Sequence, residues 1–178
     1  MTVSMSIGLL VLRVVGGLTI AAHGAQKLFG WFDGPGYIKV RNGYAGQRLN
    51  PAWLWAGLVV LGELGGGLSF AFGFLTPLGA AGMVGAMFMA IFKVHWKNGF
   101  FNGKRGIEFP LSLLTIATGI GLAGPGAYSL DSLFGINLPM PWLFLALAVV
   151  AIIVDLIGLA ISRPVETPSP TPEAARVS

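Results

Sequence analysis

The chain is organised by five long apolar segments that are separated by polar, glycine-rich stretches. The segments cover residues 7–28, 52–75, 78–95, 109–123 and 141–161. A helix needs about 20 mostly apolar residues to cross a bilayer, and the first, second and fifth segments reach that length. The third and fourth are shorter and depend on charged side chains at their ends that extend to the interface. The pattern predicts an all-α fold, a polytopic membrane helix bundle.

The composition agrees with a membrane protein. Hydrophobic residues make up 54% of the chain and charged residues only 10%, whereas a soluble domain has about 25% charged residues. The sequence pI near 9.8 is then interpreted as charge that faces anionic lipid, so no nucleic-acid partner is expected. Because the chain contains no Cys, disulfides, thiolate nucleophiles and iron–sulfur clusters are excluded.

The positive charges predict an orientation. Ten of the eleven Lys and Arg residues lie at or beyond alternate ends of the apolar segments, all on one side of the predicted bundle. Cytoplasmic loops of membrane proteins are enriched in Lys and Arg, so this side is predicted to face the cytoplasm of a cell-membrane protein. With five spans, the N-terminus lies outside and the C-terminus inside. Residues 30–51 are expected to form a loop, and the Pro-rich residues 163–178 a disordered cytoplasmic tail.

Two charged residues fall near the middle of the membrane in the predicted spans. Arg13 lies ten residues before His23, and Glu63 lies eleven residues into the second segment. Both depths are about 15 Å by helical rise. An ionisable group at the bilayer centre costs about 2.5–3.5 kcal/mol, so these two residues are predicted to form a buried ion pair. Such a pair fixes helix register or takes part in proton movement.

Further polar residues are predicted to gather at the cytoplasmic interface. On the first helix, steps of three or four residues place several of them on one face, and a polar face on a membrane helix should point into the bundle. The ends of the third and fourth segments contribute the rest. The candidate site consists of His23, Gln26, Lys27, His95 and Glu108. Whether Asp155 of the fifth segment joins them is left open. Two other interpretations are less favoured: a haem held by the two His residues, and a metal ion held by His23, His95 and Glu108. No metal is assigned.

Several short motifs follow one another in a specific order. They are HGAQKLFGWFDGPG at 23–36, ELGGG at 63–67, GFLTP at 73–77, VH at 94–95 with GFF at 99–101, EFP at 108–110, and GPG at 124–126 with SLD at 129–131. In this combination the sequence resembles the DoxX family of membrane proteins. The resemblance covers about residues 5–132. It implies a four-helix membrane core over residues 1–132, with the loop and fifth helix of residues 133–162 and the tail as additions.

The resemblance also implies an association with redox chemistry, because relatives are subunits of quinone-linked oxidoreductases. Under this hypothesis His23, His95 and Glu108 supply protons as catalytic residues, while Gln26 and Lys27 bind and polarise a quinone. The chain contains no recognisable flavin, nucleotide or cluster motif. A soluble redox enzyme at the cytoplasmic face would therefore have to deliver the electrons.

A second hypothesis belongs to another class. The chain could be a non-catalytic membrane scaffold whose basic loops dock soluble redox enzymes by charge. The loop residues concerned are Lys39, Arg41, Arg48, Lys104 and Arg105. A transporter is a weaker alternative, because no inverted repeat is evident. Membrane lipid is the remaining expected partner, and a homo-oligomer stays open.

Overall fold

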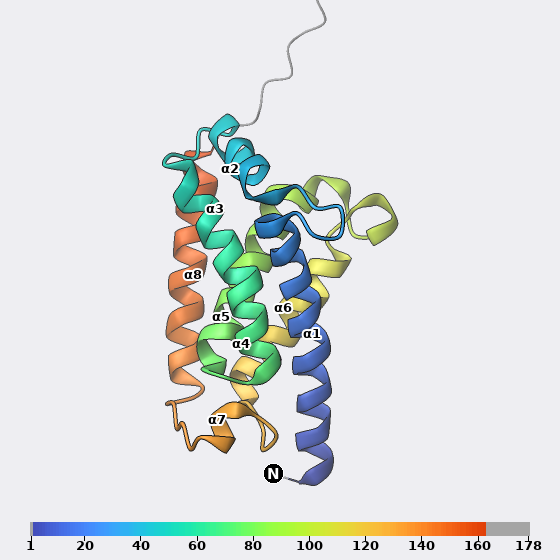
Figure 1. Ribbon diagram of the computed structural model, residues 1–178, viewed down its shortest axis with the longest axis vertical. Coiled ribbons are helices and arrows are strands. Elements are labelled where there is room, and N and C mark those ends of the chain that lie inside the picture. The colour runs from blue at the N-terminus through green and yellow to red at the C-terminus, as the bar shows by residue number, and fades with distance from the viewer. Residues whose placement is uncertain (1, 163–178) are drawn as a thin grey trace, which may run out of the picture.

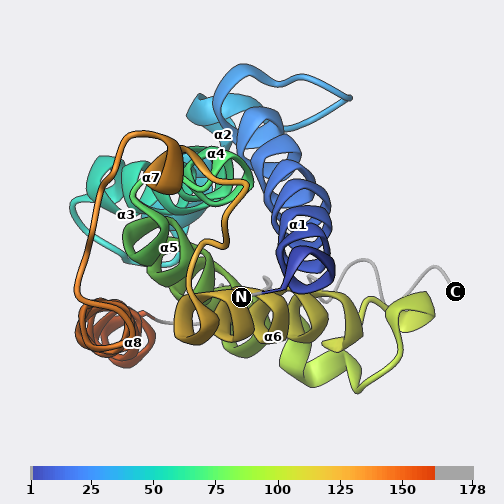
Figure 2. The same ribbon diagram turned by 90° about the horizontal axis from the view of Figure 1, so that it is seen from below.

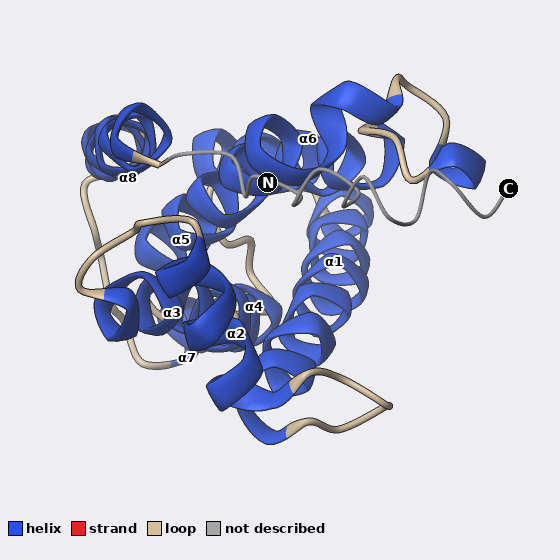
Figure 3. Cartoon of the chain, turned by 90° about the horizontal axis from the view of Figure 1, so that it is seen from above, coloured by secondary structure: helices blue, strands red, loops and turns tan. Residues whose placement is uncertain are grey.

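Four helices of the described part of the chain, residues 2–162 of this computed structural model, are long and apolar enough to cross a membrane. They are α1 (Val3–Phe29), Ala52–Phe72, Thr76–Asn98 and α8 (Trp142–Ile161). The apolar helix α6 (Glu108–Ala123) is shorter, with 16 residues. No strand occurs among the described residues (Figure 3). The predicted polytopic helical bundle is confirmed.

The second and third spans are not uniform α-helices. The second consists of α3 (Ala52–Val60), the π-helical turn η1 (Leu61–Gly65) and α4 (Gly66–Phe72). The third consists of α5 (Thr76–Met89), the π-helical turn η2 (Ala90–His95) and the 3-10 turn η3 (Trp96–Asn98). A further 3-10 turn, η4 (Asn102–Lys104), lies in the loop that follows. Single π-turns inside helices are rare and occur frequently at functional sites.

Helix α5 forms the centre of the bundle. It packs against α4, α6 and α8, while α1 packs against α4 and α6 on the other side. Viewed along the helices, α8 therefore lies at one flank and α1 at the opposite one (Figure 2). The contact of α1 with the second span depends on small residues: a Cβ on Gly17 would come within 2.6 Å of the Ala71 amide in α4, and one on Gly24 within 2.4 Å of the Leu64 amide in η1. Close helix contacts of this kind are a common packing mode in lipid.

The outer faces of the helices are apolar. Val11 and Val15 of α1 and Val149, Val150 and Ile153 of α8 are all about half exposed or more. In water such a surface would be unusual for a monomer. In a bilayer it is the surface that contacts lipid tails, which agrees with the membrane location.

The connections divide the bundle into two ends. Helix α2 (Gly36–Gly46), the loop of residues 99–107 and the end of α8 lie at one end, which we call the basic end (Figure 1). Helix α2 corrects the prediction of a loop over residues 30–51. Its three glycines and low hydrophobicity hide it in the sequence. It is stabilised instead by packing on α3 and α1, including a hydrogen bond of 3.1 Å from the Tyr37 hydroxyl to the Trp53 carbonyl.

The opposite end holds the N-terminus of α1, the α4–α5 turn and the short helix α7 (Leu130–Leu133) (Figure 1). Here the buried Asp131 carboxylate accepts hydrogen bonds from the Leu75 amide (2.7 Å), the Thr76 amide (2.9 Å) and the Thr76 hydroxyl (2.6 Å). It thereby caps the N-terminus of α5, where the helix dipole favours an anion. The tail predicted over residues 163–178 lies outside the described residues.

Candidate functional site

Glu63 forms a salt bridge with Lys27. This finding corrects the predicted pair of Arg13 and Glu63. Arg13 is fully buried, donates a hydrogen bond to the Tyr128 carbonyl, and lies near the negative charge of Asp131. It therefore belongs to the cluster at the opposite end of the bundle.

Arg13 and Glu63 lie at different depths in the bundle for a geometric reason. The Arg13 guanidinium packs against Gly73, since a Cβ added to that glycine would lie 1.5 Å from its Nη1 atom. Gly73 follows Glu63 by ten residues, or about 15 Å of helix, which is beyond the reach of an arginine side chain. Lys27 starts at the basic end, and its side chain extends toward the N-terminus of α1, as helical side chains do. It therefore reaches Glu63 in η1.

The ion pair borders a small cavity of about 240 Å³, which we call the chamber. It lies beneath α2, between α1, η1 and η2. Both π-helical turns contribute to its wall, η1 through Glu63 and η2 through Lys93 and Val94. Glu63 is 2% exposed, and its Oε2 atom has no hydrogen-bond partner. The polar residues that line the chamber are Lys27, Lys39, Tyr44, Gln47, Glu63 and Lys93.

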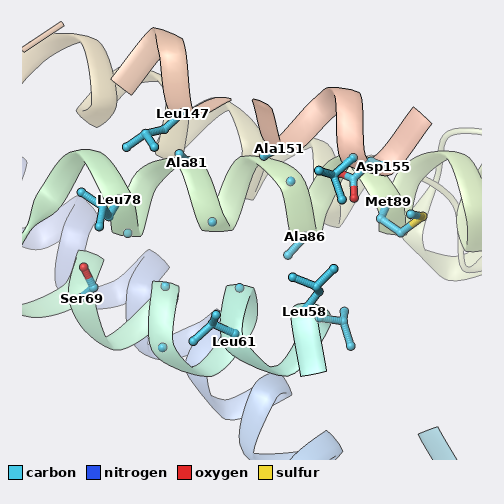
Figure 4. A pocket seen from close by; sticks show the side chains of 18 of the residues that line it. Leu58, Leu61, Ser69, Leu78, Ala81, Ala86, Met89, Leu147, Ala151 and Asp155 are labelled. Carbon is cyan, nitrogen blue, oxygen red and sulfur yellow. The ribbon is translucent and has the colours of Figure 1, made fainter. Parts of the chain in front are cut away.

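A larger apolar cavity of about 720 Å³, the slot, runs between the second span, α5 and α8. Its size is in the range of small-molecule sites. Along α5 it extends from Leu78 to Met89, about 16 Å by helical rise. Figure 4 shows Ser69, Leu78 and Leu147 toward one end of the slot and Met89 and Asp155 toward the other. Tyr44, Val59, Ala86 and Met89 line both cavities, so the slot and the chamber are adjacent.

The slot has polar groups at its basic end. The Trp55 indole Nε1 and the Asp155 carboxylate Oδ2 are buried there without a hydrogen-bond partner. Buried polar atoms are rarely left unpaired in native proteins, so these two atoms are candidates for ligand contacts. Tyr44 of α2 lies close to both cavities, and its pKa is raised to about 12 by burial and then by the negative charges of Glu63 and Asp155.

The residues predicted on the first helix have separate surroundings. The His23 ring packs against the Phe109 ring, with centroids 5.6 Å apart. The Gln26 side-chain amide donates to the Phe32 carbonyl at 3.1 Å. Of the five predicted site residues, Lys27 alone lines one of the two cavities.

His95 and Glu108 hold the loop between η2 and α6. His95 Nδ1 lies 2.6 Å from the Arg105 carbonyl, and Glu108 Oε2 accepts a hydrogen bond of 2.8 Å from the Asn102 amide. Within residues 2–162, no three His, Asp or Glu side chains form a group that could hold a metal ion. The observed contacts of His95 and Glu108 are structural. A catalytic role for His23, His95 and Glu108 stays a prediction.

Sequence reasoning missed Tyr44 and Trp55 as site residues. Tyr44 lies in a glycine-rich stretch that does not show a helical pattern, and Trp55 is one apolar residue among many in α3. A carboxylate inside a span was the available signal for Asp155, because such groups are costly in lipid and usually functional.

Residues 8–96 match the model of the DoxX family. The chain is 33% identical over 130 residues to the inner membrane protein YqjF of Escherichia coli (strain K12), an alignment that covers 71% of this chain and 92% of the relative. No solved structure matches significantly.

Proposed function

Because the chain belongs to the DoxX family, we propose that it is the membrane subunit of a quinone-linked redox system and that the slot is its quinone site. The observation that carries this proposal is the apolar slot with unpaired polar atoms at one end. A quinone is a compact polar ring on a long apolar tail, and the slot has the same division along its length.

The residues at the basic end of the slot suit the quinone ring. Trp55 Nε1 and the Tyr44 hydroxyl are hydrogen-bond donors, and a quinone carbonyl would supply the acceptor that the indole lacks. Asp155 could exchange a proton with a quinone oxygen, which is the role of a general acid–base group. The apolar side chains between Leu78 and Met89 would contact the isoprenoid tail. A bound quinone accepts two electrons and two protons.

The electrons would come from a soluble enzyme at the basic end. The described Lys and Arg residues outside the spans lie at this end, so under the positive-inside rule this end would face the cytoplasm. The polar end of the slot is then close to the cytoplasmic surface. A donor that docks there would have a short path to the ring.

Quinone binding can be tested by tryptophan fluorescence. A short-chain benzoquinone such as decylubiquinone quenches nearby indoles, so titration of the protein in nanodiscs should show a saturable quench. Trp55→Phe should remove most of the saturable component. Trp142→Phe is the matched control, because Trp142 is 74% exposed at the far end of α8. A quench that rises linearly in both variants would contradict a bound quinone.

A scaffold remains a second candidate because of one specific observation. The five basic residues Lys39, Arg41, Arg48, Lys104 and Arg105 are exposed, and none takes part in a salt bridge within the described residues. Exposed charges of one sign attract partners of the opposite sign. Affinity purification after replacement of Arg41, Arg48, Lys104 and Arg105 by Gln would test this function. Loss of a co-purifying soluble enzyme, with the quinone titration unchanged, would favour the scaffold.

A further inference from the structure

We propose that the chamber is a binding site for the head group of an anionic phospholipid that carries hydroxyl groups beyond its phosphate, as phosphatidylglycerol does, and that one acyl chain of this lipid lies in the slot. The inference goes beyond the quinone proposal and does not depend on it. It rests on the charges of the chamber, on an unsatisfied carboxylate oxygen and on the continuity of the two cavities.

The chamber attracts an anion. Three lysines from three elements line it, Lys27 from α1, Lys39 from α2 and Lys93 from η2. Glu63 neutralises one of them through the salt bridge with Lys27. Lys93 donates one hydrogen bond to the Ser162 hydroxyl, and an ammonium group has three donors. Lys39 and Lys93 therefore have donors left for a phosphate group.

The chamber also presents an acceptor, which narrows the choice of head group. Glu63 lines the chamber, and its Oε2 atom is buried without a hydrogen-bond partner. A buried carboxylate oxygen gains a strong hydrogen bond if the ligand brings a donor, and it opposes a ligand that brings only phosphate oxygens. A head group with both a phosphate and a free hydroxyl satisfies the lysines and Glu63 together. The glycerol head group of phosphatidylglycerol has this chemistry.

The size and position of the cavities agree with such a lipid. The chamber of about 240 Å³ has the volume of about eight water molecules at ~30 Å³ each, which accommodates a head group but no large ring system. It lies at the basic end, where a phospholipid phosphate is found. The adjoining slot is apolar and about 16 Å long on α5, so an acyl chain can enter it past Tyr44 and Ala86.

This arrangement has a consequence for the slot. An acyl chain and a quinone tail would occupy the same apolar space between α5 and α8, so lipid binding and quinone binding would exclude each other. The retained lipid would then act as a regulator of access to the slot.

Native mass spectrometry of the delipidated full chain tests the inference. The probes are phosphatidylglycerol, phosphatidylmethanol, which has the same charge but no hydroxyl, and phosphatidylcholine, which has neither the charge nor the donor. We expect one phosphatidylglycerol to bind about tenfold more tightly than phosphatidylmethanol, a difference of about one hydrogen bond to a charged group, and more tightly still than phosphatidylcholine, which also lacks the net charge. Equal retention of the three lipids would show annular lipid only and would overturn the proposal. Displacement of the lipid by millimolar inorganic phosphate alone would also overturn it, because it would indicate a free-phosphate site.

Variants locate the lipid. Lys39→Gln should weaken phosphatidylglycerol binding several-fold, while Lys104→Gln, an exposed lysine that lines neither cavity, should have no effect. Val150→Phe narrows the mouth of the slot and should weaken binding, while Val149→Phe on the same helix should not. If Val150→Phe leaves lipid binding unchanged, the acyl chain does not lie in the slot. Since the lipid comparison uses the wild-type chain, the Glu63 argument is tested without a variant that disturbs the ion pair.

Discussion

Lys27 of α1 and Glu63 of the π-helical turn η1 form a salt bridge in which the two partners are buried unequally. The Glu63 side chain is 3% exposed and the Lys27 side chain 31% exposed. The pair joins the first two spans and forms part of the chamber wall. The energetic cost of breaking it therefore depends on which partner is removed, because only one of them can reach water.

The first prediction concerns this asymmetry. Lys27→Met leaves a buried carboxylate without its cation and should lower the free energy of unfolding by about 3–5 kcal/mol. Glu63→Gln leaves a lysine that can still reach water and should cost less. Thermal unfolding in mild detergent, followed by near-UV circular dichroism, measures both, and Lys97→Met at an exposed lysine on η3 is the control. Equal losses for the two single variants would contradict the burial argument.

The second prediction concerns the cap on α5. Asp131→Asn replaces one acceptor oxygen with an amide that faces the Thr76 donors, and it removes the charge near Arg13. Hydrogen bonds to a charged group contribute about 1.5–3 kcal/mol each, so the loss should be at least about 2 kcal/mol in the same unfolding assay. Asp33→Asn in an exposed loop should leave the midpoint unchanged. An unaltered midpoint for Asp131→Asn would show that the cap is dispensable.

The third prediction concerns Tyr44. Its pKa is raised from 10.0 to about 12 in the folded chain, so the folded state holds the phenol proton more tightly than the unfolded state. The stability that this provides is fully present below pH 10 and is lost as the pH rises from 10 to 12. A tyrosinate absorbance titration should show a late step, and Tyr44→Phe should remove it. Tyr37→Phe should retain the late step; if it does not, the assignment is incorrect.

Much of the fold could be predicted from the sequence because membrane spans are set by a strong local signal. Apolar length and flanking Lys and Arg placed the spans of α1, α5 and α8 to within a few residues. Helix α2 carries no such signal, since it is short, glycine-containing and held by contacts with α1 and α3. Local patterns do not report stabilisation that comes from tertiary packing.

The site was harder to predict because it depends on relative helix height. Counting residues placed Arg13 and Glu63 at the same depth, but the side chain of Lys27 extends along its helix and Arg13 packs against Gly73. The slot is lined mostly by Leu, Ala and Gly residues, and such residues are common in every membrane helix. A cavity is a property of how the helices pack, and no single segment encodes it.

A matched pair of variants on α8 tests most directly whether the slot binds a ligand. Val150 lines the slot and Val149 does not, although they are 57% and 55% exposed, respectively. Titration with decylubiquinone, followed by quenching of Trp55, should give an apparent Kd at least about tenfold weaker for Val150→Phe than for Val149→Phe, which corresponds to ~1.4 kcal/mol. The same Kd for both variants, with both proteins folded, would contradict quinone binding in the slot.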